Sequence, residues 1–203
     1  MASISNYSEL VTAITKWFLA GDMSEDADEI IALAEAYFNV KLRLRQMETI
    51  ATLTAVSNVY ALPTDYIEYK RVVEKASTRR RLEFITEDAV DRLYPSRTSG
   101  LSNHFTIIGS SLYTFPLSST DMELTYYAKI PGLSDANPTN WLLTAHPNLY
   151  LHACLLYAAE LVKDDGKLST ESTFVQNYVD LLHSADNRAK FANAGVTLPG
   201  NVW

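Results

Sequence analysis

The sequence lacks most of the residue patterns that support a disulfide framework, a metal site or a nucleotide-binding loop. Its 203 residues include one cysteine, Cys154, so no disulfide can form within the chain. The seven glycines form neither Gly-x-Gly-x-x-Gly nor a Gly-Lys-Ser/Thr phosphate loop, and the four histidines show no His-Glu-x-x-His spacing. We therefore expect neither a cofactor nor a metal.

Basic side chains and long apolar runs are also scarce. The 17 Lys and Arg against 24 Asp and Glu give a net charge of −7, which disfavours a grip on DNA phosphates. No apolar run approaches the ~18 residues of a membrane span, and the first residues do not resemble a signal peptide. The 47% hydrophobic and 20% charged residues are typical of one globular domain, with or without an insertion.

Both ends of the chain predict helices. Apolar residues recur at helical spacing over about 7–20, and a second helix over about 27–47 begins acidic and ends basic, as the helix dipole favours. A third helix, over about 147–163, is apolar almost all round and is therefore expected to be buried. We expect Thr144 to cap its start and Asp165-Gly166 to end it, with Gly166 left-handed. A further helical face runs over 170–192.

The middle of the chain predicts short strands. Alternating and β-branched residues recur between turn signals, Gly109-Ser110-Ser111 indicates a tight hairpin, and residues 86–94 indicate a short capped helix. The expected fold class is α+β: mainly an α-helical bundle with an inserted antiparallel β-sheet or small sandwich, and an extended C-terminal tail. The expected parts are a helical bundle over 1–48 and 139–190, a β-rich insertion over 49–138, and an extended arm over 191–203.

The residues that could carry chemistry are better explained by structure. Ser110 and Ser111 suit a turn, and Cys154 and His152 lie two apart on a helix, so their side chains diverge. Asp164-Asp165-Gly166 lacks the alternating oxygen ligands of a calcium loop. We expect no catalytic residues and no enzyme, while a hydrolase whose site is assembled from scattered residues remains an alternative.

Two sets of residues are candidates for contacts with partners. Arg79, Arg80 and Arg81 form either a solvated hairpin or a contact with an acidic neighbouring subunit, and Trp141 is either a core aromatic or part of a subunit seam. The tail contains no charged side chain, and its apolar residues need a surface to lie against. We predict that it docks on a partner through Val196, Leu198, Pro199, Val202 and Trp203.

A longer pattern resembles a known family. A strand ending in Tyr126-Tyr127-x-x-Ile130-Pro131 is followed by Thr139-Asn140-Trp141-Leu142-Leu143, then by His146-Pro147-x-Leu149-Tyr150-Leu151 and a helix closing on Asp164-Asp165. This order resembles the tail-adaptor, or head-completion, proteins of tailed bacteriophages, and Leu62-Pro63-x-Asp65-Tyr66 extends the likeness. The pattern marks membership and carries no known chemistry.

The resemblance implies a structural subunit of the virion neck. Members form a ring, expected to be dodecameric, that joins the portal protein to tail or nozzle proteins and continues the DNA channel without specific DNA binding. It implies assembly in the bacterial host cytoplasm and no membrane. An acidic adaptor domain of a cellular protein remains a second alternative.

Overall fold

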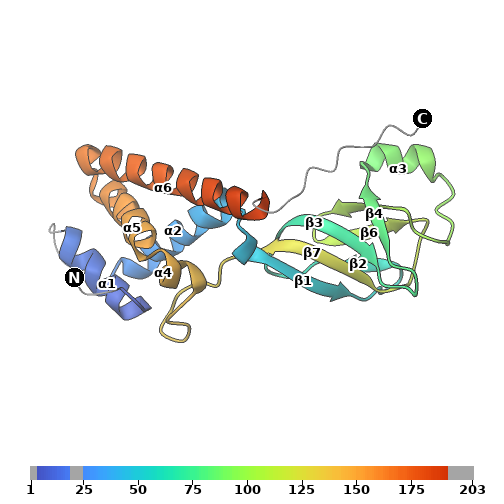
Figure 1. Cartoon of the computed structure of the whole chain (residues 1–203), viewed down its shortest axis with the longest axis horizontal. Helices are drawn as coiled ribbons and strands as arrows, with labels where there is room; N and C mark the ends of the chain where they lie inside the picture. Colours follow the sequence, from blue (N-terminus) through green and yellow to red (C-terminus); the bar gives the residue numbers. More distant parts are fainter. Residues whose placement is uncertain (1–3, 19–24, 192–203) are drawn as a thin grey trace. The chain divides into compact units, whose positions relative to one another are not determined.

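The computed structural model describes residues 4–18 and 25–191, and these fall into two compact units (Figure 1). The helical unit comprises residues 1–46 and 130–203, and the sheet unit comprises residues 47–129. Residues 130–138, which the sequence analysis assigned to the β-rich insertion, group with the helices. No helix among the described residues is long and apolar enough to cross a membrane.

The helical unit is built around one buried helix. Its helices are α1 (Tyr7–Phe18), α2 (Ala27–Lys41), α4 (Trp141–Ala145), α5 (Pro147–Val162) and α6 (Asp165–Phe191). Helix α5 packs against all four others, as its apolar surface on every side predicts (Figure 1). Its buried residues are Leu149, Tyr150, Leu151, Ala153, Cys154, Leu155, Ala158 and Ala159. The predicted buried helix is therefore confirmed.

Both predicted ends of α5 are wrong in detail. His146, not Thr144, is the residue that precedes the helix, and Thr144 lies inside α4. The left-handed residue is Lys163, with φ of 59°, and Gly166 lies inside α6. The Asp164 carboxylate accepts a hydrogen bond from the Lys167 backbone N–H at 3.1 Å, which lets α6 begin immediately after the turn.

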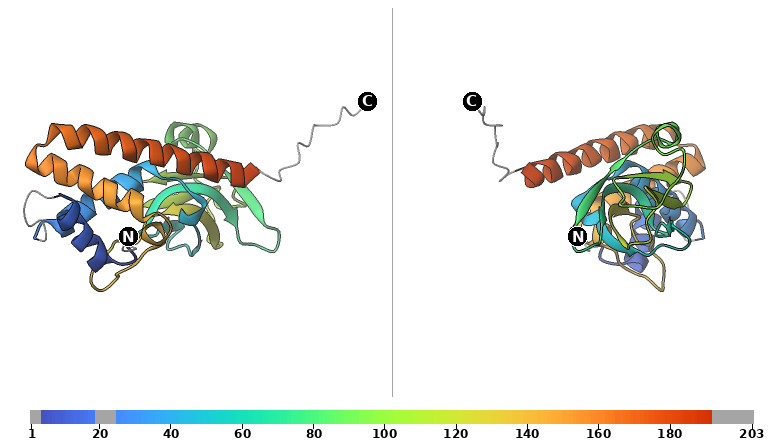
Figure 2. Two further views of the ribbon diagram at one scale, coloured as in Figure 1. Left: turned by 60° about the vertical axis from the view of Figure 1, so that its left-hand side comes forward. Right: turned by 90° about the vertical axis from the view of Figure 1, so that its right-hand side faces the viewer.

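The sheet unit contains one seven-stranded sheet. Its strands are β1 (Glu48–Leu53), β2 (Val59–Ala61), β3 (Tyr66–Glu74), β4 (Arg80–Phe84), β5 (His104–Ile108), β6 (Ser111–Phe115) and β7 (Met122–Ala128), and α3 (Glu87–Leu93) joins β4 to β5. The strand order is β1-β7-β3-β4-β5-β6-β2, and the sheet curls into a half-barrel (Figure 2). The predicted hairpin and short helix are confirmed: Gly109 has φ of 59° between β5 and β6.

The predicted fold class is wrong in the size and kind of the sheet. The chain is strand-rich, and its sheet is a large, mixed half-barrel; the prediction was a small antiparallel insertion in a mainly helical bundle. The pair β4–β5 is parallel, with Glu83 opposite His104 and Phe84 opposite Phe105. A parallel pair needs a crossover, and α3 supplies it.

A buried ion-paired carboxylate ties α6 to residue 45. Asp186 is 7% exposed, and its Oδ1 accepts from Arg45 Nε at 2.8 Å while its Oδ2 meets Lys190 Nζ at 2.6 Å. Burial disfavours the charged form, but the hydrogen bonds from Lys190 and Arg45 outweigh it and hold the Asp186 pKa below the usual 3.8. The unfolded chain therefore binds a proton at Asp186 more tightly than the folded chain does. The stabilisation that Asp186 contributes is fully present above its unfolded pKa and is lost as the pH falls through its folded pKa.

Replacing Asp186 with Asn is expected to lower the free energy of unfolding by about 1.5–3 kcal/mol at pH 7, because hydrogen bonds to charged groups contribute that much. The difference in stability between parent and variant should narrow below about pH 4, because the parent chain then loses the contribution of ionised Asp186 as well. Urea unfolding at pH 7 and below about pH 4 measures the loss and its narrowing. Asp180→Asn, an exposed change on the same helix, is the matched control and should alter stability by less than about 0.5 kcal/mol. Equal losses in the two variants would contradict a specific role for Asp186.

Candidate interaction surfaces

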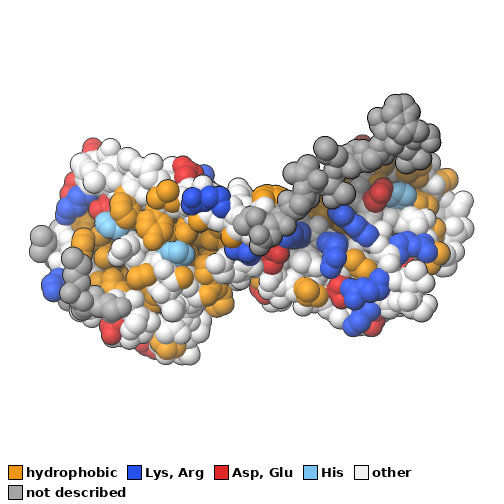
Figure 3. Space-filling view, in the orientation of Figure 1, with side chains coloured by type: hydrophobic (Ala, Val, Ile, Leu, Met, Phe, Trp, Pro, Cys, Tyr) orange, Lys and Arg blue, Asp and Glu red, His pale blue; other side chains and the backbone are white. Residues whose placement is uncertain are grey.

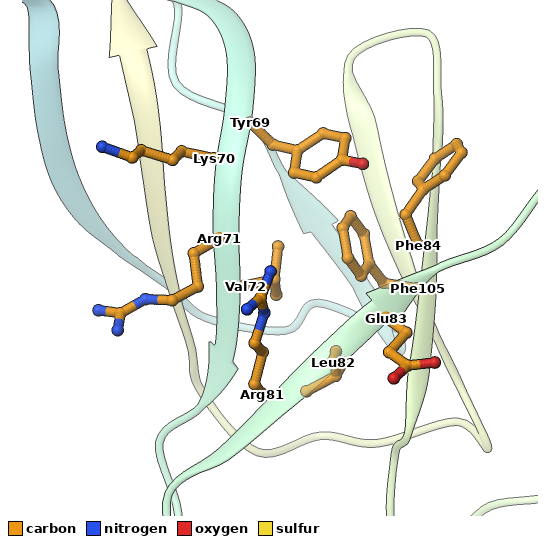
Figure 4. A pocket seen from close by; sticks show the side chains of 9 residues that line it. All are labelled: Tyr69, Lys70, Arg71, Val72, Arg81, Leu82, Glu83, Phe84 and Phe105. Atoms are coloured by element: carbon orange, nitrogen blue, oxygen red, sulfur yellow. The ribbon is translucent and has the colours of Figure 1, made fainter. Parts of the chain in front are cut away.

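A cleft opens in the sheet unit where β3 and β4 separate (Figure 4). Strand β4 pairs with β3 only through residues 80–82, opposite residues 72–74, and its last residues turn to β5. Among the described strands, the first half of β3 therefore pairs with β7 on one side alone, and two register shifts bend it. The resulting β3–β4 cleft has a volume of about 400 Å³ and is lined by Tyr69, Lys70, Arg71, Val72, Arg81, Leu82, Glu83, Phe84 and Phe105.

Three aromatic rings form one wall of the β3–β4 cleft. Tyr69 stacks on Phe84 with ring centroids 5.5 Å apart, and both rings meet Phe105 edge-on at 5.1 and 5.7 Å (Figure 4). Phe105 is buried, whereas Phe84 is 45% exposed. An exposed ring held in place by two neighbours loses little freedom on binding, which is a property of interface anchors.

Arginine side chains form the other wall. Arg71 lies 3.6 Å from Glu123, which also accepts a hydrogen bond from Arg79. Arg80 donates to Asn103 at 3.1 Å, and Arg81 forms no hydrogen bond or ion pair with any residue that the structure describes. Lys and Arg side chains are spread over the visible face of this unit (Figure 3). The β3–β4 cleft thus combines an unpaired cation with aromatic surface.

A smaller groove lies between α2 and α5 in the helical unit. This α2–α5 groove has a volume of about 190 Å³ and is lined by Asp26, Glu29, Ile30, Leu33, Tyr157, Glu160 and Leu161. Leu33 and Leu161 are 44% and 55% exposed, and every charged side chain in the lining is acidic. By sequence, the helical unit holds 8 Lys and Arg against 14 Asp and Glu, whereas the sheet unit holds 9 against 10.

A buried hydrogen-bond network fixes the segment that carries the family-like pattern. The Tyr150 hydroxyl donates to Glu35 Oε1 at 2.6 Å, and the same oxygen accepts the Leu133 backbone N–H at 2.7 Å. Asn140 donates from Nδ2 to the Pro131 carbonyl and to the Tyr150 oxygen, while its Oδ1 accepts the Leu143 N–H and caps α4. Asn140 and Tyr150 of the pattern therefore fix the position of this segment.

Comparison with known proteins places this architecture in a family. The family model described as SU10 adaptor protein matches residues 5–198, which is nearly the whole chain. The chain belongs to the SU10 adaptor protein family. No curated protein matches it. The resemblance to phage adaptors that the pattern indicated is thus confirmed at the level of the family.

Membership of the SU10 adaptor family indicates what kind of protein this is. It points to a structural adaptor of a bacteriophage that belongs to the virion and interacts with other phage structural proteins. Surfaces that contact other proteins are therefore of interest, and the β3–β4 cleft and the α2–α5 groove are two concave surfaces among the described residues.

Two residues of this SU10 adaptor family member that could carry chemistry, Ser110 and Cys154, lie in a turn and in a buried helix. Ser110 is a turn residue whose carbonyl accepts the Leu62 N–H at 2.9 Å. Cys154 is fully buried, and burial, with the charge of Glu35, raises the pKa of its thiol well above the usual value. Its neighbour His152 pairs with Glu171 at 2.6 Å.

The histidines lie apart from any metal-ligand set. The rings of His152 and Phe174 pack with their centroids 3.9 Å apart, Phe174 also contacts Tyr178, and Tyr178 contacts His146. Histidine side chains lie among hydrophobic ones on the face of the helical unit that Figure 3 shows. Burial lowers the pKa of His146. Within residues 4–18 and 25–191, no three His, Cys, Asp or Glu side chains are grouped so that they could hold a metal ion.

The predicted contact residues are only partly brought together. Of the arginines, Arg81 lines the β3–β4 cleft, while Arg79 and Arg80 lie beside it in pairs with Glu123 and Asn103. Trp141 is partly buried at the start of α4, in the other unit. The predicted docking residues Val196, Leu198, Pro199, Val202 and Trp203 lie outside the described residues. Their roles stay predictions.

The α2–α5 groove was not predicted from the sequence. Asp26 and Glu29 belong to the acidic start of the second predicted helix, which the helix dipole explains, and that account is sufficient for one helix in isolation. One residue in the sequence that could have indicated the groove is Leu33, an apolar side chain of α2 that α5 leaves exposed. Glu160-Leu161 near the end of an otherwise apolar helix was the second signal.

Proposed function

We propose that this protein is a ring subunit at the portal vertex, which joins the portal protein to tail or nozzle proteins and continues the DNA channel. The observation that carries the proposal is the SU10 adaptor family match over residues 5–198. In this proposal the ring is dodecameric, it is assembled in the host cytoplasm, and the subunit has no enzymatic activity.

The charge of the chain supports a conduit for DNA. At −7 per copy, a ring of many copies repels the phosphate backbone and lowers non-specific adhesion of the passing genome. The acidic excess is concentrated in the helical unit, with 14 Asp and Glu against 8 Lys and Arg. DNA passes through such a channel without specific binding.

Docking on the portal is assigned to the uncharged tail. Residues 192–203 contain no Asp, Glu, Lys or Arg, and they carry Val196, Leu198, Pro199, Val202 and Trp203. An extended apolar segment can fill pockets on a partner, where Trp is among the strongest anchors. The arm is the part of the chain that reaches the portal in this proposal.

Deleting residues 196–203 is expected to weaken binding to assembled portal by about 100-fold or more, because several apolar anchors are lost together. Binding is measured with portal from the same phage, and the mass of the complex gives the number of bound copies. The matched control replaces Thr197 and Asn201 with Ala, which leaves the apolar anchors in place and should keep binding within about 3-fold. Unchanged binding of the deletion would remove the arm from the proposal, and absence of any complex with the full chain would overturn the proposed function.

A further inference from the structure

We propose that neighbouring copies of this chain contact each other through two different surfaces, with the β3–β4 cleft of one copy seated on the α2–α5 groove of the next. The inference rests on the proposed ring. A closed ring of identical subunits uses a heterologous interface, in which two different patches of the same chain are complementary. The chain carries such a pair on its two units.

The charges of the two surfaces are opposite. The β3–β4 cleft is lined by Lys70, Arg71 and Arg81 against one acid, Glu83, so its lining is basic on balance. Arg81 has no partner among the described residues. The α2–α5 groove presents Asp26, Glu29 and Glu160 with no basic side chain in its lining. Opposite potentials speed encounter and fix the register of an interface, and like-charged contacts such as groove on groove are disfavoured.

The apolar parts match in size as well. Phe84 is 45% exposed and is held by Tyr69 and Phe105, so its ring is a preformed anchor. The α2–α5 groove has apolar walls, including exposed Leu33 and Leu161, and a volume of about 190 Å³. An apolar cavity of about 150 Å³ accepts benzene, so the groove is large enough for one phenyl ring.

A second copy fits the groove better than the other available occupants. The uncharged tail offers no cation for three carboxylates, and DNA is repelled by them. A basic aromatic surface satisfies both the carboxylates and the exposed leucines, and the sheet unit of every copy supplies one. Guanidinium groups are also the cations best suited to paired contact with carboxylates.

Cross-linking between two variants tests the pairing. One variant carries Ala36→Cys, an exposed position one turn beyond Leu33 on α2, and the other carries Glu83→Cys in the cleft. The two are mixed, assembled on portal from the same phage, and treated with a short bismaleimide. The natural Cys154 is fully buried and contributes little background. We expect an adaptor dimer in the mixture, and none with either variant alone.

In the control mixture, a variant carrying Ser184→Cys takes the place of the Ala36→Cys variant. Ser184 is exposed on α6 and lies outside the groove. Its cross-linking should be at least about 10-fold weaker, because proximity sets the effective concentration of the two thiols. Dimers formed by one variant alone, or equal yields in both mixtures, would overturn the pairing even where rings form. Failure of the parent chain to assemble on portal would overturn the proposed function together with this inference.

Charge reversal gives an independent measurement. Arg81→Glu should lower the number of copies assembled on portal by about 10-fold, because like charges then meet across the interface. Adding Glu29→Lys to the same chain restores opposite charges at every contact of the ring and should recover assembly to within about 3-fold. Arg92→Glu, an exposed change on α3 outside the cleft, is the matched control. If Arg81→Glu lowers assembly on portal and the double variant does not recover it, the proposed contact between Arg81 and Glu29 of the neighbouring copy is wrong.

Discussion

Replacing Glu35 with Ala is expected to destabilise the helical unit by about 3 kcal/mol, because each buried group left without its partner costs about 1–3 kcal/mol. Glu35 Oε1 accepts from the Tyr150 hydroxyl at 2.6 Å and from the Leu133 N–H at 2.7 Å. Tyr150 is fully buried, so its hydroxyl cannot turn to solvent after the change. Chemical denaturation followed by the helical signal measures the loss.

The variants Glu35→Gln and Tyr150→Phe separate the hydrogen bonds from the charge. Glutamine keeps an acceptor oxygen and nearly the same volume, so this variant should lose less than about 1 kcal/mol at pH 7. In a double-mutant cycle, Glu35→Ala and Tyr150→Phe should couple by about 1–2 kcal/mol, because they remove the same hydrogen bond. Additive losses would show that the two side chains do not stabilise each other.

The pH dependence of Glu35 has a defined sign. Burial raises its pKa above the usual 4.5, although the hydrogen bonds from Tyr150 and Leu133 act in the opposite direction. The folded chain therefore binds this proton more tightly than the unfolded chain does. The stability that this gives is fully present below the unfolded pKa and is lost as the pH rises through the folded pKa, which is opposite to Asp186. The Glu35→Gln variant should lack this loss.

The elements of the fold could be predicted where the signal is local. Helix α5 is apolar on all sides and is buried, and the residues Gly109-Ser110-Ser111 bring β5 and β6 together. These features depend on neighbours within a few positions. The start of α6 was misplaced because Gly166 suggested a helix end, while the Asp164 side chain caps the new helix and Lys163 takes the left-handed conformation.

The pairing of the strands could not be predicted in the same way. Alternation assigns residues 80–84 to a strand and gives no information about whether the partner is parallel. The decisive feature is α3, which was expected as a short helix and not as a crossover that makes β4 and β5 parallel. The cleft between β3 and β4 follows from that choice of partners, so its aromatic wall was not visible in the sequence.

The contact surfaces depend on the same long-range placement. Arg81 was recognised within the run of arginines, but the sequence does not show that Arg79 and Arg80 pair with Glu123 and Asn103 while Arg81 has no partner among the described residues. The α2–α5 groove combines residues about 130 positions apart in the sequence, such as Glu29 and Glu160, and no local pattern joins them. Local patterns thus identified side chains, and only the tertiary fold grouped them into surfaces.

Replacing Tyr60 with Ala is expected to destabilise the sheet unit by about 4 kcal/mol, since truncating a buried aromatic side chain costs about 3–5 kcal/mol. Tyr60 is fully buried on β2, within the cluster that includes Leu112 and Phe105. Its hydroxyl lies 2.9 Å from the Ser118 carbonyl oxygen and 2.7 Å from that of Thr120. The side chain therefore joins the short strand β2 both to the core and to the connection between β6 and β7.

Two variants of the same strand divide this effect into its parts. Tyr60→Phe keeps the ring and should lose only about 1 kcal/mol, the usual contribution of a hydrogen bond. Ala61→Ser is an exposed change and should stay within about 0.5 kcal/mol of the parent. Hydrogen exchange of the β6 and β7 amides reports the stability of the sheet unit, and the amides of α5 report the helical unit for comparison. Equal losses in Tyr60→Ala and Tyr60→Phe would mean that the hydroxyl, and not the packing of the ring, accounts for the role of this residue.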